Sequence, residues 1–247
     1  MPLARLIPCL DVAAGRVVKG IRFQGLRDVG DPVELGSAYS EAGADELVLL
    51  DVAATVEERP LLAGLVSRVA DALAIPFTVG GGVRTLADAE ALLRAGADKV
   101  AVNSAALERP ALIGELAALL GSQAVVVAID ASRGQVHARA GTTPTGRDAV
   151  GWAREAEERG AGEILLTSMD ADGTRTGYDL ELTASVADAV GVPVIASGGA
   201  GDAGHVADAL GVAQAALLAS IVHESPTRLE SLRDELRGLG VRLRDAA

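Results

Sequence analysis

The chain contains one long internal repeat, in which similar segments return after about 117 residues, and this repeat limits the folds open to it. Glu46 and Glu163, for example, lie 117 positions apart in similar surroundings. A repeat of this length indicates a fold assembled from two similar halves. Three pairs of segments carry the repeat: AGADELVLLD at 42–51 with GAGEILLTSMD at 160–170, VGGGVR at 79–84 with ASGGAG at 196–201, and NSAALERPALI at 103–113 with ASIVHESPTRL at 219–229.

Within each half, short aliphatic runs alternate with longer amphipathic segments, a pattern typical of βα units around a parallel sheet. Eight such units in 247 residues predict an α/β fold, a (β/α)8 TIM barrel built from two half-barrel repeats. Because no linker separates the halves, we expect a single domain over 1–247, with half-barrels of about 1–122 and 123–247. The predicted strands are 5–10, 46–51, 76–79, 98–102, 124–130, 163–167, 193–197 and 214–218.

Composition excludes several classes of partner. A net charge of -12, with 2% aromatic residues and no basic cluster, argues against nucleic acid. The longest apolar runs, 47–50 and 124–129, are too short to cross a bilayer, and no signal peptide begins the chain, so we expect a cytoplasmic protein. The only cysteine, Cys9, lies in an apolar run and is expected to be an inert buried thiol. The histidines show no metal-ligand spacing, and we expect neither a metal nor a cofactor.

Two aspartates end predicted strands at equivalent places in the repeat. Asp11 closes LIPCLD and Asp130 closes AVVVAID, 119 positions apart. In a barrel of this type, reactive groups lie where the strands end, so the two carboxylates should face each other across the mouth. Such a pair can serve as general acid and general base if their pKa values differ. The alternative is that each aspartate only caps the turn that follows it.

Glycine-rich turns form a second symmetric pair. Gly80-Gly81-Gly82 follows the third predicted strand and Ser197-Gly198-Gly199 follows the seventh. Asn103 with Ser104, and Ala219 with Ser220, follow the neighbouring strands. Glycine lets the backbone approach an anion, and helix N-termini add free N–H donors, so each half should form one phosphate socket. The ligand should then carry a phosphate at both ends. Taken singly, each Gly-Gly pair could also be an ordinary tight turn.

Charged residues mark the opposite ends of four predicted strands. Arg5, Glu46, Lys99 and Glu163 all fall where a strand begins. Two cations and two carboxylates can balance one another in a ring across the barrel floor, since lone buried charges are unfavourable. A structural salt-bridge layer and a functional gate explain this ring equally well.

Other polar residues are expected near the mouth. The glycine-rich stretch 12–31 is longer than usual βα loops and predicts a mobile lid carrying Lys19 and Arg22, with Lys19 contacting the substrate. The segment DADGTRTGYD has alternating carboxylates but lacks the later carboxylate of a calcium loop, so we predict no metal there. The remaining residues expected at mouth-side strand ends or loops are Thr55, Thr78, Asp170, Asp172, Thr174 and Gly177.

Motifs that lie along nearly the whole chain are IPCLDV, GRVVKG, DPVELGSAYSEAGADELVLLD, VGGGVR, GADKVAVNSAA, AIDA, TSMDADGTRTGYD and IASGGAG. In combination they resemble the cyclase subunits of imidazole glycerol phosphate synthase, from histidine biosynthesis. Three segments depart from that pattern: 131–141 is short, 211–214 is one residue short, and 223–226 replaces a segment that contains an aromatic residue.

The resemblance implies that ammonia closes an imidazole ring on a bisphosphorylated phosphoribulosyl-formimino aminoimidazole carboxamide ribonucleotide. The products are imidazole glycerol phosphate and aminoimidazole carboxamide ribotide. It implies proton transfer by Asp11 and Asp130. It further implies phosphate contacts from Gly82, Asn103, Ser104, Ser197, Gly199, Ala219 and Ser220, and other substrate contacts from Lys19, Asp51, Thr78, Thr167, Asp172 and Gly177.

The resemblance also implies a partner, a glutaminase subunit that docks on the barrel floor and supplies ammonia through the barrel. The four floor charges then correspond to an ammonia gate, and Asp98 becomes a candidate contact with that partner. The residues alone leave other functions open: the related phosphoribosyl isomerase of the same pathway, a non-catalytic scaffold for the glutaminase, or a phosphate-binding barrel of another chemistry.

Overall fold

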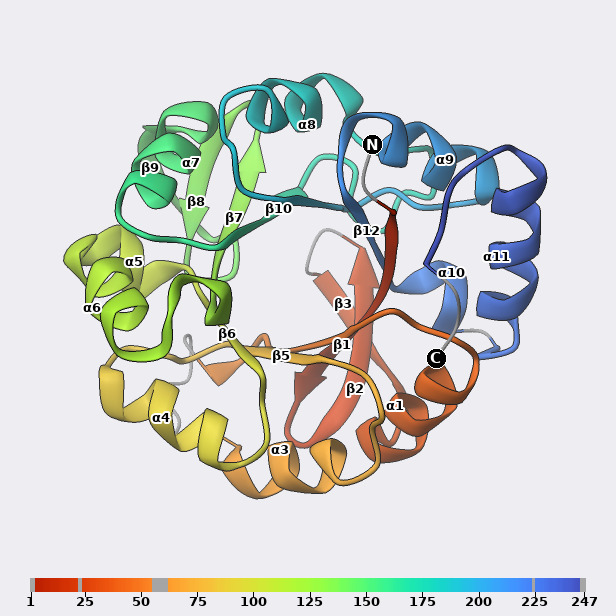
Figure 1. The fold of residues 1–247 in the computed structure, drawn as a ribbon, viewed down its shortest axis with the longest axis horizontal. Helices are drawn as coiled ribbons and strands as arrows, with labels where there is room; N and C mark the ends of the chain where they lie inside the picture. The colour runs from red at the N-terminus through yellow and green to blue at the C-terminus, as the bar shows by residue number, and fades with distance from the viewer. Residues whose placement is uncertain (1–2, 22–23, 55–61, 224, 245–247) are drawn as a thin grey trace.

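The computed structural model describes residues 3–21, 24–54, 62–223 and 225–244. These residues form a closed barrel of eight parallel strands. The sheet closes because β10 pairs with both β7 and β11, while β1 pairs with both β12 and β4 (Figure 1). The predicted barrel is therefore confirmed. The barrel strands are β1 (Arg5–Ala13), β4 (Leu47–Asp51), β5 (Phe77–Gly80), β6 (Lys99–Val102), β7 (Val125–Ser132), β10 (Glu163–Ser168), β11 (Val194–Ser197) and β12 (Ala215–Leu218).

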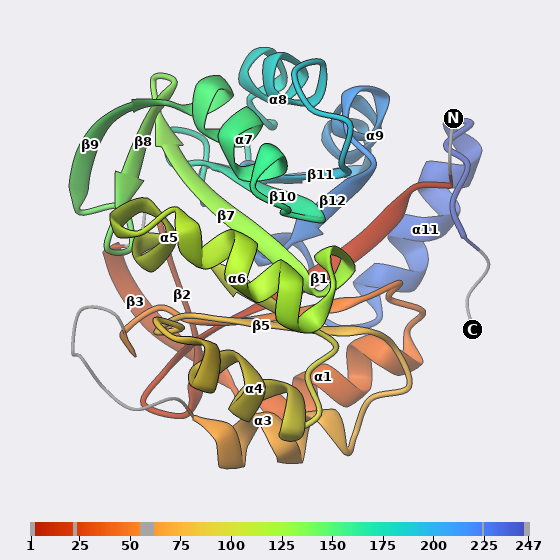
Figure 2. The same ribbon diagram turned by 60° about the vertical axis from the view of Figure 1, so that its left-hand side comes forward.

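Helices surround the barrel on the outside (Figures 1 and 2). Two of them begin at equivalent caps, because the side chain of Asp31 accepts a hydrogen bond from the backbone N–H of Val33 and that of Asp148 from Gly151. The helices are α1 (Pro32–Glu41), α3 (Ala63–Ala70), α4 (Leu86–Arg94), α5 (Ser104–Glu108), α6 (Ala111–Leu120), the 3-10 turn η1 (Ser122–Ala124), α7 (Ala149–Glu158), α8 (Leu180–Ala187), α9 (Ala203–Val212), α10 (Ser220–His223) and α11 (Arg228–Gly238).

Alternation along the strands divides the apolar residues into two cores. Side chains such as Leu6 and Leu10 point outward and pack under the helices in the larger core. Ile7 and Leu165 point inward and fill the barrel together with Val126. The interior is a packed layer between the two ends of the barrel, so polar groups at each end are separated by apolar side chains.

Two antiparallel hairpins extend the barrel at one end (Figure 2). They are β2 (Arg16–Ile21) with β3 (Gln24–Gly30), and β8 (Gln135–Ala138) with β9 (Thr143–Asp148). The turn that joins β1 to β2 and the turn that joins β7 to β8 each contain two residues with positive φ. These are Ala14 (51°) and Gly15 (78°) in the first turn, and Arg133 (49°) and Gly134 (74°) in the second. Such turns match the twist of paired strands. The expectation that 12–31 is a loop is therefore wrong, although Arg22 lies outside the described residues.

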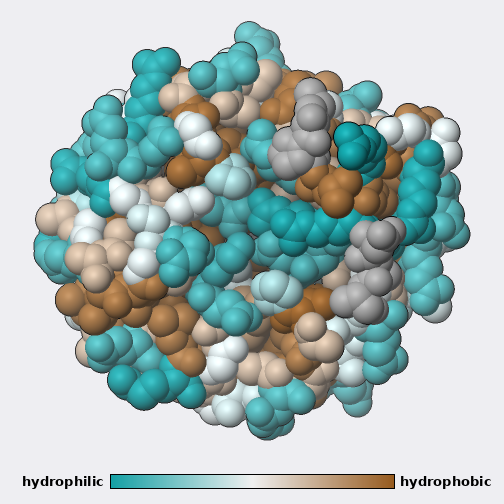
Figure 3. All heavy atoms as spheres, in the orientation of Figure 1, coloured by the Kyte–Doolittle hydropathy of each residue, from teal (hydrophilic) through white to brown (hydrophobic). Residues whose placement is uncertain are grey.

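The surface mixes residue types. Figure 3 shows one face of the molecule, on which hydrophilic and hydrophobic residues are interspersed. The described part of the chain holds no helix whose length and apolar character would suit a bilayer crossing. The single-domain organisation and a cytoplasmic location stay predictions. Large apolar side chains more than a third exposed are Leu3, Leu119, Leu180 and Leu239.

Candidate active site

The strands end around a cavity of about 590 Å³ at the hairpin end of the barrel, where Lys19 and Arg139 of the two hairpins line it. Asp11 from β1 and Asp130 from β7 both line this cavity. The structure thus brings together the two carboxylates that the repeat placed at equivalent strand ends. Most of the predicted substrate residues line the same cavity: Lys19, Asp51, Gly82, Asn103, Ser104, Thr167, Asp172, Ser197, Gly199, Ala219 and Ser220.

Asp11 lies in an ion-paired environment. Lys19 Nζ, from β2, is 3.2 Å from Asp11 Oδ2 and 3.3 Å from Asp172 Oδ1. Burial raises the pKa of Asp11, and the Lys19 charge opposes that rise. Burial alone would lower the pKa of Lys19, but the two carboxylates outweigh it and raise that pKa, so the ammonium stays charged. The hairpin thus delivers a fixed cation to one of the two aspartates.

Asp130 lies in a different environment. Asn103 Nδ2 donates a hydrogen bond of 2.9 Å to Asp130 Oδ2. Burial, together with the negative charges of Asp172 and Asp11, raises the pKa of Asp130 to about 7. A carboxyl group with this pKa is protonated in part of the molecules near neutral pH, so it can donate a proton.

The first glycine turn approaches the backbone of the neighbouring strand closely. Gly81 has a φ of 92°, and a Cβ built on it would lie 2.2 Å from the carbonyl oxygen of Asp51. Only glycine fits there. The Ser104 hydroxyl accepts a hydrogen bond of 2.8 Å from the backbone N–H of Arg139, which ties the hairpin β8–β9 to the start of α5. Gly82 and Ser104 both line the cavity, and their contact with a phosphate stays a prediction.

The second glycine turn packs against the backbone of Gly177. Gly199 has a φ of 108°, and a Cβ on it would lie 2.0 Å from the carbonyl oxygen of Gly177. The Gly177 N–H donates to the Gly199 carbonyl over 2.9 Å. Gly177 does not line the cavity within the described residues. It supports Gly199 from the neighbouring segment, and its contact with substrate stays a prediction.

Sequence reasoning misplaced one residue and missed others. Thr78 pairs in register with Lys99, and it does not line the cavity within the described part of the chain. The expectation that it lies at the mouth is wrong, because β5 continues beyond it to Gly80. Thr55 lies outside the described residues. Three cations that line the cavity were not predicted: Arg84, Arg109 and Arg139. Arg84 and Arg109 lie close in sequence to Gly82 and Ser104, which was a signal for them. Arg139 comes close to Ser104 only through the fold of the hairpin.

The segment after β10 shapes the rim. The Asp170 carboxylate accepts a hydrogen bond of 3.0 Å from the Ser132 hydroxyl and one of 2.8 Å from the Arg133 N–H. The Thr174 hydroxyl donates to the Ala171 carbonyl over 2.7 Å. The side chains of Asp170 and Thr174 thus hold turns beside the cavity. The Asp172 carboxylate, from the same segment, accepts a hydrogen bond from Lys19.

At the opposite end, the four predicted floor charges form a closed ring. Arg5 pairs with Glu46 over 2.7 Å and with Glu163, and Lys99 lies 2.9 Å and 3.0 Å from the same two carboxylates. Burial alone would raise the pKa of Glu46, but Arg5 and Lys99 outweigh it and lower that pKa. Two cations and two carboxylates therefore compensate one another in the buried ring.

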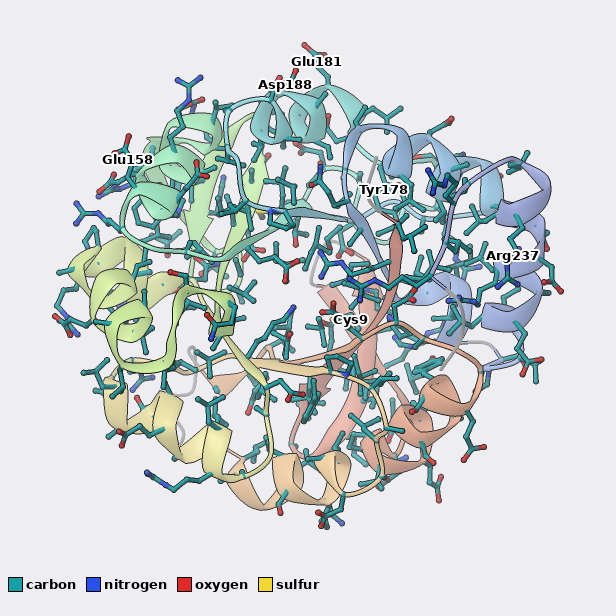
Figure 4. All side chains as sticks on the ribbon, viewed as in Figure 1. Cys9, Glu158, Tyr178, Glu181, Asp188 and Arg237 are labelled. Carbon is teal, nitrogen blue, oxygen red and sulfur yellow. The ribbon has the colours of Figure 1, made fainter. Side chains whose placement is uncertain are left out.

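Two further predicted residues have structural partners. The Asp98 carboxylate accepts a hydrogen bond of 2.8 Å from the first N–H of β5, at Phe77. Asp98 is nevertheless exposed at the floor, beside Lys99. Cys9 is buried near the centre of the barrel (Figure 4), and its thiol lies 3.7 Å from Asp11 Oδ1. Burial and the Asp11 charge raise the pKa of Cys9, which keeps the thiol protonated.

Comparisons with known proteins agree with this geometry. The imidazole glycerol phosphate synthase subunit HisF of Acidobacterium capsulatum is 58% identical over 246 residues, with 97% of each chain covered. The proteins of the same name from Exiguobacterium sibiricum and Trichormus variabilis are 54% and 53% identical, covering 99% and 97% of this chain and 100% and 97% of their own. The name describes each as one subunit of an enzyme. Since the model of the histidine biosynthesis protein family also matches residues 5–228, the chain belongs to that family.

Proposed function

We propose that this chain is the cyclase subunit of imidazole glycerol phosphate synthase. It would use ammonia to convert the phosphoribulosyl-formimino aminoimidazole carboxamide ribonucleotide into imidazole glycerol phosphate and aminoimidazole carboxamide ribotide. The observation that carries the proposal is the placement of Asp11 and Asp130 in one cavity between two glycine turns. The names of the full-length relatives support the same activity.

The two aspartates divide the proton transfers. Ammonia adds to the open-chain carbonyl of the sugar, a step in which the nitrogen loses a proton and the oxygen gains one. Asp130, with a pKa of about 7, supplies the proton that lets the oxygen leave as water. Asp11, held beside Lys19, accepts protons from the nitrogen. The imine left after loss of water gives up a proton from the adjacent carbon and takes one up on nitrogen, which yields an enamine. The enamine nitrogen then attacks the formimino carbon, and the bond from that carbon to the aminoimidazole nitrogen breaks. That nitrogen leaves as an amine after it takes up the protons that the ring-closing nitrogens lose.

The glycine turns hold the ends of the substrate. Backbone N–H groups around Gly82 and Gly199 offer donors to phosphate oxygens, and Ser104 and Ser220 begin short helices at the two sockets. Arg84, Arg109 and Arg139 add positive charge at the first socket. A substrate with one phosphate in each socket would span the mouth with its reacting centre between the aspartates.

We further propose that a glutaminase subunit supplies the ammonia at the barrel floor. Support comes from the closed ring of Arg5, Glu46, Lys99 and Glu163, which lies across the barrel from the cavity. Ammonia entering there would pass this ring, so the four charges would act as a gate. Asp98 is exposed next to Lys99 and is available to a docked partner.

The proposal is tested with the isolated chain, the formimino-ribulosyl substrate and an ammonium salt. We expect substrate loss with formation of both products, and none when Asp11 or Asp130 is changed to asparagine. Turnover that is independent of ammonium would point to the related sugar isomerase. A lack of turnover by the folded, unaltered chain would point to a scaffold for the glutaminase.

A further inference from the structure

A hydrogen-bonded pair of polar side chains lies beneath the second socket. The Tyr39 hydroxyl, from α1, is 2.7 Å from Nδ1 of His223, the last residue of α10. Tyr39 is fully buried, and the two rings lie 6.1 Å apart at a tilt of 37°. This contact joins a helix on the outside of the barrel to the short helix whose first residue, Ser220, lines the cavity.

The equivalent pair of positions at the other junction between the halves is occupied by apolar residues. The repeat pairs Asp31 with Asp148 and Ser104 with Ser220, so Ala156 corresponds to Tyr39 and Leu107 corresponds to His223. Ala156 and Leu107 are both buried in the main core. The contact between an outer helix and the neighbouring short helix can therefore be made by apolar side chains alone. Packing does not explain why Tyr39 and His223 are polar.

The pair is also unfavourable as a packing element. The backbone of Cys9 interacts with the His223 imidazole, but the buried Nε2 makes no hydrogen bond of ordinary geometry among the described residues. An unsatisfied buried polar atom destabilises a fold. Burial and the positive charges of Lys19 and Arg27 lower the pKa of His223 to about 4, so the imidazole is neutral at physiological pH. It is thus a fixed, uncharged hydrogen-bonding group.

The short helix α10 has only four residues and needs outside support. Arg175 Nη2 donates a hydrogen bond of 2.9 Å to the carbonyl of Ser220 at its start. The contact between His223 and Tyr39 holds its end. We propose that His223 is a positioning residue for the second phosphate socket, fixing α10 against α1 so that Ala219 and Ser220 face the phosphate. The inference rests on the proposed function, since it names the socket of that site.

The test replaces His223 with the residue found at the equivalent place in the first half. His223→Leu should keep or raise the melting temperature, because it removes an unsatisfied polar atom. Each product carries a single phosphate, so calorimetry with the two products separately reports on the two sockets. We expect one product to bind His223→Leu about tenfold more weakly and the other to bind within about twofold of the unaltered chain.

A second variant covers the case in which His223→Leu does not fold. Tyr39→Phe removes one hydroxyl group and keeps the ring, and it should weaken the binding of the same product. Combining both changes should add little, since either one breaks the same bond. Ser37→Ala removes a hydroxyl bond to Glu41 on the same helix and should change neither affinity.

Each other outcome is decisive. Unchanged affinities for both products, or an equal loss for both, would overturn the positioning role of His223 while leaving the cyclase assignment in place. An unaltered chain that binds neither product would instead contradict the proposed function, and the inference would fall with it.

Discussion

Nζ of Lys19 lies 3.2 Å from Oδ2 of Asp11, and among the described residues of the second half this ion pair has no equivalent. The registers Val12 with Val17 and Ala131 with Val136 make Ala138 the counterpart of Lys19. Asp130 therefore receives a neutral amide hydrogen bond where Asp11 receives a cation. One substitution within a symmetric scaffold separates the pKa values of two equivalent carboxyl groups, as an acid/base pair requires.

The raised pKa of Asp130 predicts a pH-dependent stability. Its folded pKa of about 7 exceeds the unfolded value, so the folded state binds the extra proton and loses stability as pH rises from about 4 through 7. Asp130→Asn cannot lose a proton. Relative to the unaltered chain, its free energy of unfolding should rise by about 4 kcal/mol between pH 4 and pH 8. Urea titrations at several pH values measure this difference. A difference that stays constant with pH would contradict the raised pKa.

Lys19→Met should remove the charge that keeps Asp11 ionised. We expect kcat/KM with ammonium to fall by about 10²-fold, because the base is then more often protonated and Asp172 loses its ion pair with Lys19. The pH profile should move toward higher pH, since the Asp11 pKa loses its only opposing cation in the described residues. Lys19→Arg is the control and should retain more activity. An unchanged profile in Lys19→Met would show that Asp11 does not depend on this pair.

The sequence was most informative where the repeat and the strand pattern coincide. All eight barrel strands were predicted, with bounds that differ by a few residues, because buried parallel strands read as apolar runs. Asp11, Asp130 and the floor ring followed from strand ends. The hairpins were missed because their turns, Ala14-Gly15 and Arg133-Gly134, resemble loop residues. Arg139 was missed because it reaches the cavity only through the fold of β8 and β9.

Gly199→Ala should damage the second socket through a steric clash. The new Cβ would lie 2.0 Å from the Gly177 carbonyl, so one of the two turns must move. Gly134→Ala is the control: its φ of 74° is also positive, but nothing lies within 4 Å of its Cβ position. We expect Gly134→Ala to destabilise by about 1 kcal/mol and to keep substrate affinity. Gly199→Ala should weaken substrate binding at least about tenfold. Equal substrate affinity in the two variants would show that the close approach of Gly199 to Gly177 does not matter for binding.

Lys99→Met should separate the stability of the floor from the chemistry at the mouth. One cation, Arg5, would then face Glu46 and Glu163, a buried imbalance that typically destabilises by about 3 kcal/mol or more. Turnover with ammonium salt should stay within about twofold, because the ring lies across the barrel from the aspartates. Turnover coupled to the glutaminase should change. Arg94→Met, which breaks an exposed pair with Glu90, should alter the melting temperature little. A loss of ammonium-driven turnover in Lys99→Met would argue against a separate gate.

The two half-barrels should unfold together. A cut near residue 122 would expose the edges of β6 and β7 and those of β12 and β1, which pair across the halves. We therefore propose that 1–247 is a single domain with one cooperative transition in urea. The sole tryptophan, Trp152, is buried in α7 and reports on the second half, while far-ultraviolet circular dichroism reports on the whole chain. Coincident transitions from the two signals are expected. If Trp152 fluorescence changed at a lower urea concentration than the dichroism, the halves would be separate units despite the shared sheet.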